Sequence, residues 1–210
     1  MYEMIILALL ARWPLHGYLI AKITNDILGP YARLSSGRLY PLLAKLETAG
    51  LIVVADDAAP ASDGRRQRRY AITDAGRQRV HELLMDTTSS LGDYQRIFWF
   101  KVPNLDLLTL EERLYLFDHY ITYCQSHIFH YTAEIADMPA HHEHFREQTK
   151  YRQAVIEVLE HTLRRWRLDL EDALQWRARV VAAEQPDTPD GAAGSGQNRN
   201  DPEGAMRRSR

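Results

Sequence analysis

Gly50 marks the point at which the hydrophobic pattern of this chain changes from helical to extended. Before it, residues 35–48 carry leucines at helical spacing, and glycine is the usual residue just beyond a helix end. After it, the extended runs 51–54 and 67–73 flank a polar loop, 55–66, which predicts a two-stranded hairpin. The chain must therefore fold as a helix followed directly by a β-hairpin.

Further helical patterns surround this pair of elements. Residues 2–12 and 16–25 precede it, and a fourth helix is predicted from Ala75 to about Met85. Three helices, a two-stranded wing and another helix are the plan of the winged helix-turn-helix, whose third helix enters the DNA major groove while the wing touches the backbone. The fold class is therefore mainly α: an N-terminal winged helix followed by an α-helical C-terminal dimerisation domain.

The third helix is expected to have one buried and one exposed side. Its leucines share one face, and the opposite face carries small and cationic residues together with Pro41 near the N-terminus. Such a face lets DNA approach closely, and the side chain of Ser35 or Ser36 is expected to cap the free amides of the first turn. The alternative interpretation is a solvated helix face with two stray cations.

Four arginines in the second arm of the hairpin favour the DNA interpretation over the solvated face. The predicted contacts to a double-stranded DNA operator lie on the second helix, the third helix and the wing: Tyr18, Lys22, Ser35, Ser36, Gly37, Arg38, Tyr40, Pro41, Lys45, Arg65, Arg66, Arg68 and Arg69.

The N-terminal 80 residues resemble the PadR family of transcriptional regulators. The resemblance rests on Leu15-His16-Gly17-Tyr18, on Ser36-Gly37-Arg38-Leu39-Tyr40-Pro41 with Leu46-Glu47 and Gly50-Leu51, and on the stretch from Arg69 to Gly76. It implies a dimeric regulator, usually a repressor, that a small molecule releases from a palindromic operator. Phenolic acids are one effector class that it allows, and cationic or other aromatic compounds are equally open.

Beyond residue 86 the pattern is helical throughout. The last helix, predicted over 145–183, repeats apolar residues at alternating steps of three and four: Ile156, Leu159, Leu163, Trp166, Leu170 and Ala173. We interpret this stripe as a homodimer interface, because a protein that binds a two-fold operator needs two copies. The alternative is a helix packed within one chain.

Two other groups of side chains are candidates for binding. The aromatic stretch Tyr94, Ile97, Phe98, Trp99 and Phe100 suits a flat, apolar effector, with ordinary core or dimer packing as the alternative, and Trp166 and Trp176 rank lower. A helix is predicted to begin at a capping box formed by Thr109 and Glu112 and to end near Ala136. His119, His127 and His130 share one face of this helix. A stripe of histidines is more often exposed to solvent than bound to a metal, so we assign neither a metal nor a cofactor to this face.

Charge, cysteine content and hydropathy limit which partner, cellular location and activity we expect. Residues 1–80 carry a net charge of +4 and residues 81–185 one of −6, so an anionic partner is expected for the front part only. A single cysteine, Cys124, and the lack of a membrane span or signal peptide favour the cytoplasm. Because no phosphate loop, nucleophile elbow or HExxH pattern occurs, we expect no enzyme.

The expected organisation is a DNA-binding domain over 1–86, a dimerisation and effector domain over 87–184, and a disordered tail over 185–210. The competing hypothesis is a helical protein–protein interaction module whose winged helix no longer binds DNA.

Overall fold

A computed structural model describes residues 1–30, 32–55, 68–141 and 149–184. The elements in chain order are α1 (Tyr2–Arg12), β1 (Leu15–His16), α2 (Gly17–Leu28), α3 (Ser36–Thr48), β2 (Ile52–Ala55), β3 (Arg69–Ile72), α4 (Asp74–Met85), η1 (Leu91–Asp93), α5 (Tyr94–Lys101), η2 (Val102–Leu107), α6 (Leu110–His141) and α7 (Thr149–Ala183). This order confirms the predicted winged helix followed by a helical region.

The sheet of the winged helix has three strands rather than the two predicted. Its order is β1-β3-β2, and both pairings are antiparallel, with Tyr70 opposite Leu15 on one side and Val54 on the other. Strand β1 is two residues long and directly precedes α2, so His16 pairs in the sheet instead of starting the helix. A strand this short leaves no alternation in the sequence, which is why the pattern did not predict it.

Helix α3 ends as Gly50 predicted. The N–H of Leu51 donates to the carbonyl of Leu46 at 3.0 Å, and the N–H of Gly50 donates to that of Glu47 at 2.9 Å. These two bonds form a Schellman motif, which needs a left-handed residue, and Gly50 supplies a φ of 71°. The chain then leaves the helix directly into β2.

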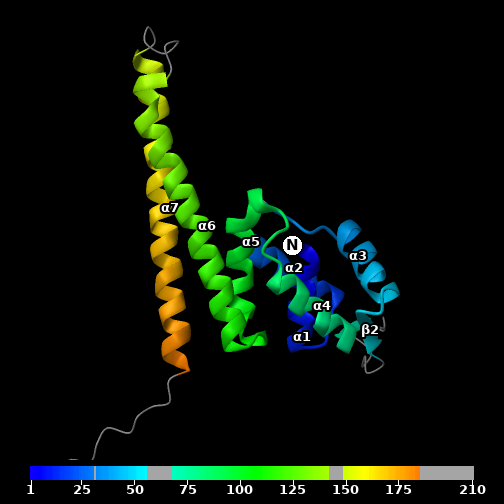
Figure 1. Ribbon diagram of the computed structural model, residues 1–210. Coiled ribbons are helices and arrows are strands. Elements are labelled where there is room, and N and C mark those ends of the chain that lie inside the picture. Colours follow the sequence, from blue (N-terminus) through cyan, green and yellow to red (C-terminus); the bar gives the residue numbers. More distant parts are fainter. Residues whose placement is uncertain (31, 56–67, 142–148, 185–210) are drawn as a thin grey trace, which may run out of the picture.

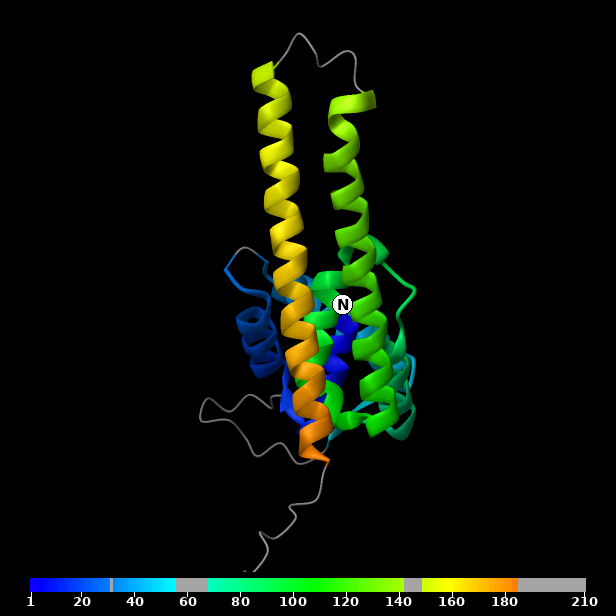
Figure 2. The same ribbon diagram turned by 60° about the vertical axis from the view of Figure 1, so that its left-hand side comes forward.

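Helices α6 and α7 form a long antiparallel hairpin beside the winged helix, and its upper half projects beyond the rest of the molecule (Figures 1 and 2). The predicted capping box starts α6, because the Thr109 N–H donates to Glu112 Oε2 at 2.9 Å and the Glu112 N–H to Thr109 Oγ1 at 3.3 Å. At the lower end, ion pairs join Arg177 to Asp118 at 2.6 Å and Arg113 to Glu184 at 2.9 Å.

Helix α6 is longer than predicted and continues to His141, over residues that the sequence suggested were a connection. Pro103 lies in a 3-10 helix, η2, in which it occupies one of the first positions. Within the described residues no helix is long and apolar enough to cross a membrane.

One continuous cluster of buried side chains joins both halves of the chain. It runs from Met4 and Leu7 of α1 through Leu43 of α3 and Phe98 of α5 to Ala173 of α7. Two polar contacts cross the same boundary: Arg12 pairs with Asp106 at 2.6 Å, and His81 Nε2 lies 2.6 Å from Glu112 Oε1. The winged helix therefore rests on the helical region through a shared core.

Candidate nucleic-acid interface

Helix α3 has the two sides that its sequence predicted. Leu39, Leu43 and Leu46 are buried against the winged-helix core. The opposite side is exposed along its whole length and carries Gly37, Arg38, Pro41, Ala44 and Lys45. Neither cation forms an ion pair within the described part of the chain, so both guanidinium and ammonium groups are available to an anionic partner. In Figure 1, α3 lies on the side of the molecule opposite α7.

The N-terminus of α3 differs from the prediction in one respect. Ser35 is the residue before the first helical turn, but its side chain makes no capping hydrogen bond. Its carbonyl accepts instead from the N–H groups of Arg38 and Leu39, both at 2.9 Å. The expected serine cap is therefore wrong for Ser35, and the exposed amides of Ser36 and Gly37 remain open to a phosphate oxygen.

Pro41 is exposed in the middle of this face and lies within the helix without ending it. Because proline has no amide hydrogen, the carbonyl of Gly37 one turn earlier lacks its helical donor. The opening falls on the exposed side near the N-terminus.

Asn25, which the sequence did not single out, fixes the entry to α3. Its side chain accepts from the Leu34 N–H at 2.6 Å and donates to the Leu34 carbonyl at 3.3 Å. These two bonds hold the segment before α3 against α2, and they define the angle between the two helices of the helix-turn-helix. The only signal in the sequence is an amide side chain near a helix end, which is too common to be informative.

Tyr40 lies beside the N-terminus of α2 as well as on the predicted DNA face. Its ring would come within 3.1 Å of a β-carbon placed on Gly17, so a larger residue at this position would require the ring to shift by a few tenths of an ångström. About half of the Tyr40 surface is exposed. Tyr40 therefore connects the first turn of α2 to α3, in addition to any contact with a partner.

A groove of about 610 Å³ separates α2 from the start of α3. Tyr18 and Lys22 of α2 line one wall, and Arg33, Ser35 and Ser36 line the other. Tyr18 is 73% exposed, so its ring and hydroxyl are open to a partner. Arg33 was missed by the sequence reasoning, because it precedes α3 in a segment without periodicity.

The two described arginines of the wing, Arg68 and Arg69, differ in how free their side chains are. Arg68 is exposed beside β3, whereas Arg69 lies in the strand and its Nε donates to the carbonyl of Pro14 at 3.1 Å. Arg69 is thus bonded to the body of the protein and has less of its guanidinium free than predicted. Arg65 and Arg66 lie outside the described residues.

The aromatic residues of α5 mostly form core rather than a pocket. Tyr94 and Phe98 are fully buried, and the Phe98 ring stacks on Tyr120 with centroids 3.8 Å apart. Burial raises the pKa of Tyr94, whose hydroxyl lies 3.0 Å from His119 Nδ1. The prediction that these two rings line an effector pocket therefore does not hold in this arrangement, because neither has surface left for a ligand. Ile97 and Phe100 are half-buried.

Trp99 is the exception in α5, because it lines a groove of about 660 Å³ between the end of α1, η2 and α7. Its indole N–H donates to Asp169 of α7 at 3.1 Å. Trp176, which the sequence ranked below the α5 residues, lines the same groove.

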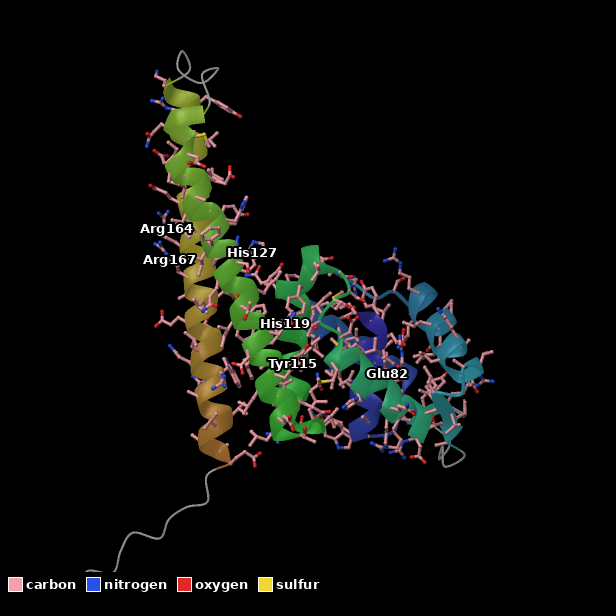
Figure 3. All side chains as sticks on the ribbon, viewed as in Figure 1. Glu82, Tyr115, His119, His127, Arg164 and Arg167 are labelled. Atoms are coloured by element: carbon pink, nitrogen blue, oxygen red, sulfur yellow. The ribbon has the colours of Figure 1, made fainter. Side chains whose placement is uncertain are left out.

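The stripe predicted as a dimer interface faces α6 of the same chain. Leu163 and Ala173 are buried there, and Ile156, Leu159, Trp166 and Leu170 are half-buried. The heptad spacing thus reflects packing of the hairpin, which was the alternative interpretation of the same pattern. Figure 3 shows Arg164 and Arg167 on the side of α7 away from the winged helix.

The histidine face of α6 is divided among aromatic contacts. His127 stacks on Trp166 with centroids 4.0 Å apart, and His119 meets Tyr94 edge to face at 5.3 Å. Figure 3 labels both histidines on α6. Burial lowers the pKa of both imidazoles, which favours their neutral forms. Within the described ranges no three side chains of the metal-binding types converge.

Comparison with known proteins gives one match to a family and several weaker ones to single proteins. Residues 6–82 match the Transcriptional regulator PadR-like family. A 37.1 kDa protein encoded in transposon TN4556 of Streptomyces fradiae is 36% identical over 103 residues, which are 49% of this chain and 26% of that protein. The chain thus spans about a quarter of the length of this relative.

Solved structures of low identity cover most of the chain. PadR of Bacillus subtilis in complex with operator DNA is 22% identical and covers 85% of this chain and 98% of its own, with a TM-score of 0.38. The structure of the same protein in complex with p-coumaric acid is also 22% identical and has the same coverage, with a TM-score of 0.35. The virulence activator AphA of Vibrio cholerae is 19% identical. The match covers 87% of this chain and 99% of AphA, with a TM-score of 0.35.

The family match coincides with the part of the chain that contains α3, its glycine-bounded end and the wing. This winged-helix region, residues 6–82, matches the model of the PadR-like family of transcriptional regulators.

Proposed function

We propose that this protein is a dimeric, DNA-binding transcriptional repressor that a small aromatic molecule releases from a palindromic operator. The observation that carries the DNA-binding part is the exposed side of α3, where Arg38 and Lys45 stand unpaired within the described chain beside open amides at the helix start. Lys22 and Arg33 add two cations around the adjoining groove. Positive side chains and backbone N–H groups together suit phosphates and guanine edges.

The predicted contacts have different roles in this proposal. The first turn of α3, with Ser35, Ser36 and Gly37, approaches a phosphate, while Arg38 and Lys45 point toward base edges and Pro41 keeps that side narrow. Tyr18 and Lys22 of α2 and Arg68 of the wing contact the DNA backbone, as Arg65 and Arg66 are expected to do. Arg69 positions the wing through Pro14.

Dimerisation, repression and release are the finer parts of the proposal. A two-fold operator requires two copies, which the region from residue 87 to 184 is proposed to join. Because the stripe of α7 is occupied by α6, the dimer contact must use other surfaces of the hairpin or the half-exposed margins of the stripe. The family consists of transcriptional regulators, which argues against an enzyme, and a DNA-bound role places the protein in the cytoplasm.

Gel-shift titration on the DNA upstream of its own coding region tests the proposal. The unmodified protein is expected to shift this DNA in a salt-dependent manner, and Arg38→Ala is expected to weaken specific binding by about 1–3 kcal/mol. Binding to unrelated duplex DNA should weaken much less, because phosphate contacts elsewhere remain.

Arg167→Ala is the matched control, because this exposed arginine of α7 lies away from the winged helix (Figure 3). Equal losses of DNA affinity in both variants would mean that Arg38 acts only through the net charge of the protein. Undiminished binding by Arg38→Ala would show that α3 is not the reading helix. If a folded dimer shifts no DNA at any salt concentration, the protein is an interaction module instead.

A further inference from the structure

One side of α6 holds the start of α5, where the chain passes from the winged helix into the helical region. Tyr94, the first residue of α5, is fully buried, and its hydroxyl lies 3.0 Å from Nδ1 of His119. One turn further along α6, the hydroxyl of Tyr123 donates to the carbonyl of Leu91 at 2.7 Å. The rings of His119 and Tyr123 also meet the Tyr94 ring edge to face, at 5.3 and 5.0 Å. Helix α6 therefore holds this segment at two neighbouring points.

The bond between Tyr94 and His119 requires a neutral imidazole. Burial raises the pKa of Tyr94, so its hydroxyl keeps its proton and can donate to Nδ1 of His119. When the imidazole is protonated, both of its ring nitrogens carry hydrogens, and Nδ1 no longer accepts. The Tyr94 hydroxyl must then turn its own hydrogen away from His119, in a place where an unsatisfied donor costs free energy. Protonation thus replaces a matched donor and acceptor by two opposed donors.

The ammonium group of Lys101 opposes protonation of His119 as well. Lys101 is buried at the end of α5, and its Nζ lies 5.8 Å from the centre of the Tyr94 ring. Burial lowers the pKa of Lys101 only to about 8, so this group is still charged where a histidine titrates. Burial also lowers the pKa of His119 below its ordinary value of 6.5, and the charge of Lys101 lowers it further.

The other polar groups near His119 do not offset the charge of Lys101. Tyr115, one turn earlier on α6, is half exposed, and its ring centre lies 6.3 Å from that of the imidazole. The carboxylate of Asp86 accepts from the N–H groups of Thr88 and Ser89, both at 3.0 Å. Among the described residues no carboxylate forms an ion pair with His119, so no such partner favours the imidazolium.

We propose that the contact between His119 and Tyr94 is a proton-sensitive switch: protonation of His119 releases the start of α5 and thereby weakens DNA binding. The DNA part of this inference rests on the proposed function. Because the closed contact disfavours the proton, its contribution to stability is complete above the ordinary pKa of 6.5 and is lost as the pH falls below that value. His119 is half-buried, so its ring reaches solvent by rotation of the side chain.

The switch is connected to the winged helix through Asp86 and Lys101. Asp86 directly follows α4, and Lys101 donates a hydrogen bond from the end of α5 to its carbonyl. When α5 moves, this bond displaces the end of α4, which packs on α1 in the winged helix. Two copies on one operator must keep their α3 helices at the spacing of the half-sites. A change in how each winged helix sits on the helical region therefore lowers DNA affinity.

Hydrogen exchange at about pH 7.5 and about pH 5.5 tests the switch without DNA. After correction for intrinsic exchange rates, the amides of α5 are expected to lose roughly fivefold or more of their protection at the lower pH. His119→Asn keeps an acceptor near the position of Nδ1 but does not titrate there, so its loss should stay below about twofold. His130→Asn is the matched control, because His130 is an exposed histidine of the same helix, and this variant should behave as the unmodified protein.

Titration of the imidazole by NMR supplies a second readout. His119 is expected to titrate with a midpoint below pH 6.5 in the full chain. Lys101→Met removes the neighbouring charge and Tyr94→Phe removes the hydroxyl but keeps the ring, so each should move the midpoint to higher pH. A midpoint that neither variant moves would overturn the switch. Equal loss of α5 protection in the unmodified protein, His119→Asn and His130→Asn would overturn it too.

Operator binding at the same two pH values separates this inference from the proposed function. At constant salt, the affinity of the unmodified protein should fall roughly fivefold or more at the lower pH, and that of His119→Asn less than about twofold. Comparison with this variant removes other titrating contacts, such as that of His81 with Glu112, whose ion pair acid strengthens. A protein that binds no DNA at either pH, while its α5 exchange depends on His119, would refute the proposed function and leave the switch standing. Equal pH dependence of DNA binding in both proteins would refute the transmission through Asp86.

Discussion

Gly76 lies in the first turn of α4, where that helix meets the end of the wing. The carbonyl of Leu51 accepts from both the N–H and the hydroxyl of Thr73, at 3.1 and 3.0 Å, and Thr73 in turn caps α4 by accepting from the Gly76 N–H at 3.0 Å. A β-carbon on Gly76 would collide with this carbonyl and come within 2.6 Å of Ile72. The close approach therefore requires glycine.

Gly76→Ala is expected to destabilise the protein by about 2 kcal/mol or more in urea unfolding, because backbone and not a flexible side chain must move. Gly92→Ala is the matched control, since a β-carbon there meets nothing within 4 Å. Its unfolding free energy should change by less than about 0.5 kcal/mol. Equal effects of the two substitutions would contradict the packing of α4 on Leu51.

Lys101 is a buried ammonium group at the junction of the two halves. Its Nζ donates to the carbonyl of Asp86 and lies 5.8 Å from the centre of the Tyr94 ring. Burial lowers the pKa of Lys101 from 10.5 to about 8, an effect that the charge of Asp86 only partly opposes. Between these two values the unfolded chain binds more protons than the folded one, so this group makes stability rise with pH.

The contribution of Lys101 is therefore expected to change by about 3 kcal/mol in favour of the folded state across that window. Lys101→Met removes the titrating group and should lose this pH dependence, which urea unfolding of both proteins at a series of pH values measures. Parallel curves for the two proteins between about pH 8 and pH 10.5 would show that the lysine is not desolvated.

At this scale the sequence predicted which residues face outward but not what they touch. The side-chain directions along α3 follow from the helical period alone, so the burial of Leu39 and the exposure of Arg38 were predictable. Arg69 was predicted as a DNA contact, yet it is bonded to Pro14, 55 residues earlier. Such a partner depends on the tertiary fold and leaves no local pattern.

Among the elements, α7 carries one carboxylate, that of Asp169, that bonds to both α5 and α6. Asp169 accepts from Trp99 Nε1 at 3.1 Å and from the hydroxyl of Tyr120, and Cys124 Sγ lies 3.8 Å away. The remaining apolar contacts of this helix are spread along its length. Asp169 therefore helps to set the register of α7 against α5 and α6, together with the ion pair between Arg177 and Asp118.

Asp169→Ala leaves both donors without an acceptor and should destabilise the protein by about 2–4 kcal/mol in urea unfolding. Asp169→Asn keeps an acceptor of the same shape, so its loss should be at least about 1 kcal/mol smaller. Equal losses would mean that the carboxylate contributes through charge alone.

The elements also show where a periodic pattern stops being informative. The repeat from Ile156 to Ala173 correctly predicted a covered stripe on α7, but a period does not name the covering surface, which is α6 of the same chain. The aromatic residues of α5 were equally visible, whereas the burial of Tyr94 and Phe98 depended on the approach of α6. Strand β1 exists only because β3 lies beside it.

On the scale of the whole molecule, the shared core bears on the proposed boundary between residues 86 and 87. Buried side chains of α1, α3, α5, α6 and α7 belong to one cluster, and the ion pair of Arg12 with Asp106 crosses the same boundary. Two regions that share a core and polar contacts are expected to unfold together. A structural change in the DNA-binding region would then affect the effector region, and the reverse, without a separate hinge.

Hydrogen exchange followed by mass spectrometry tests this cooperativity. Asp169→Ala perturbs only the packing of α5, α6 and α7, at a distance in sequence from the winged helix. If unfolding is global, the slowest amides of α1 and α3 should lose as much protection as those of α7, since all report the same free energy. Loss of protection confined to α6 and α7 would establish two independent units. The Gly76→Ala variant supplies the converse experiment, in which a defect at the wing should reach the slowest amides of α7.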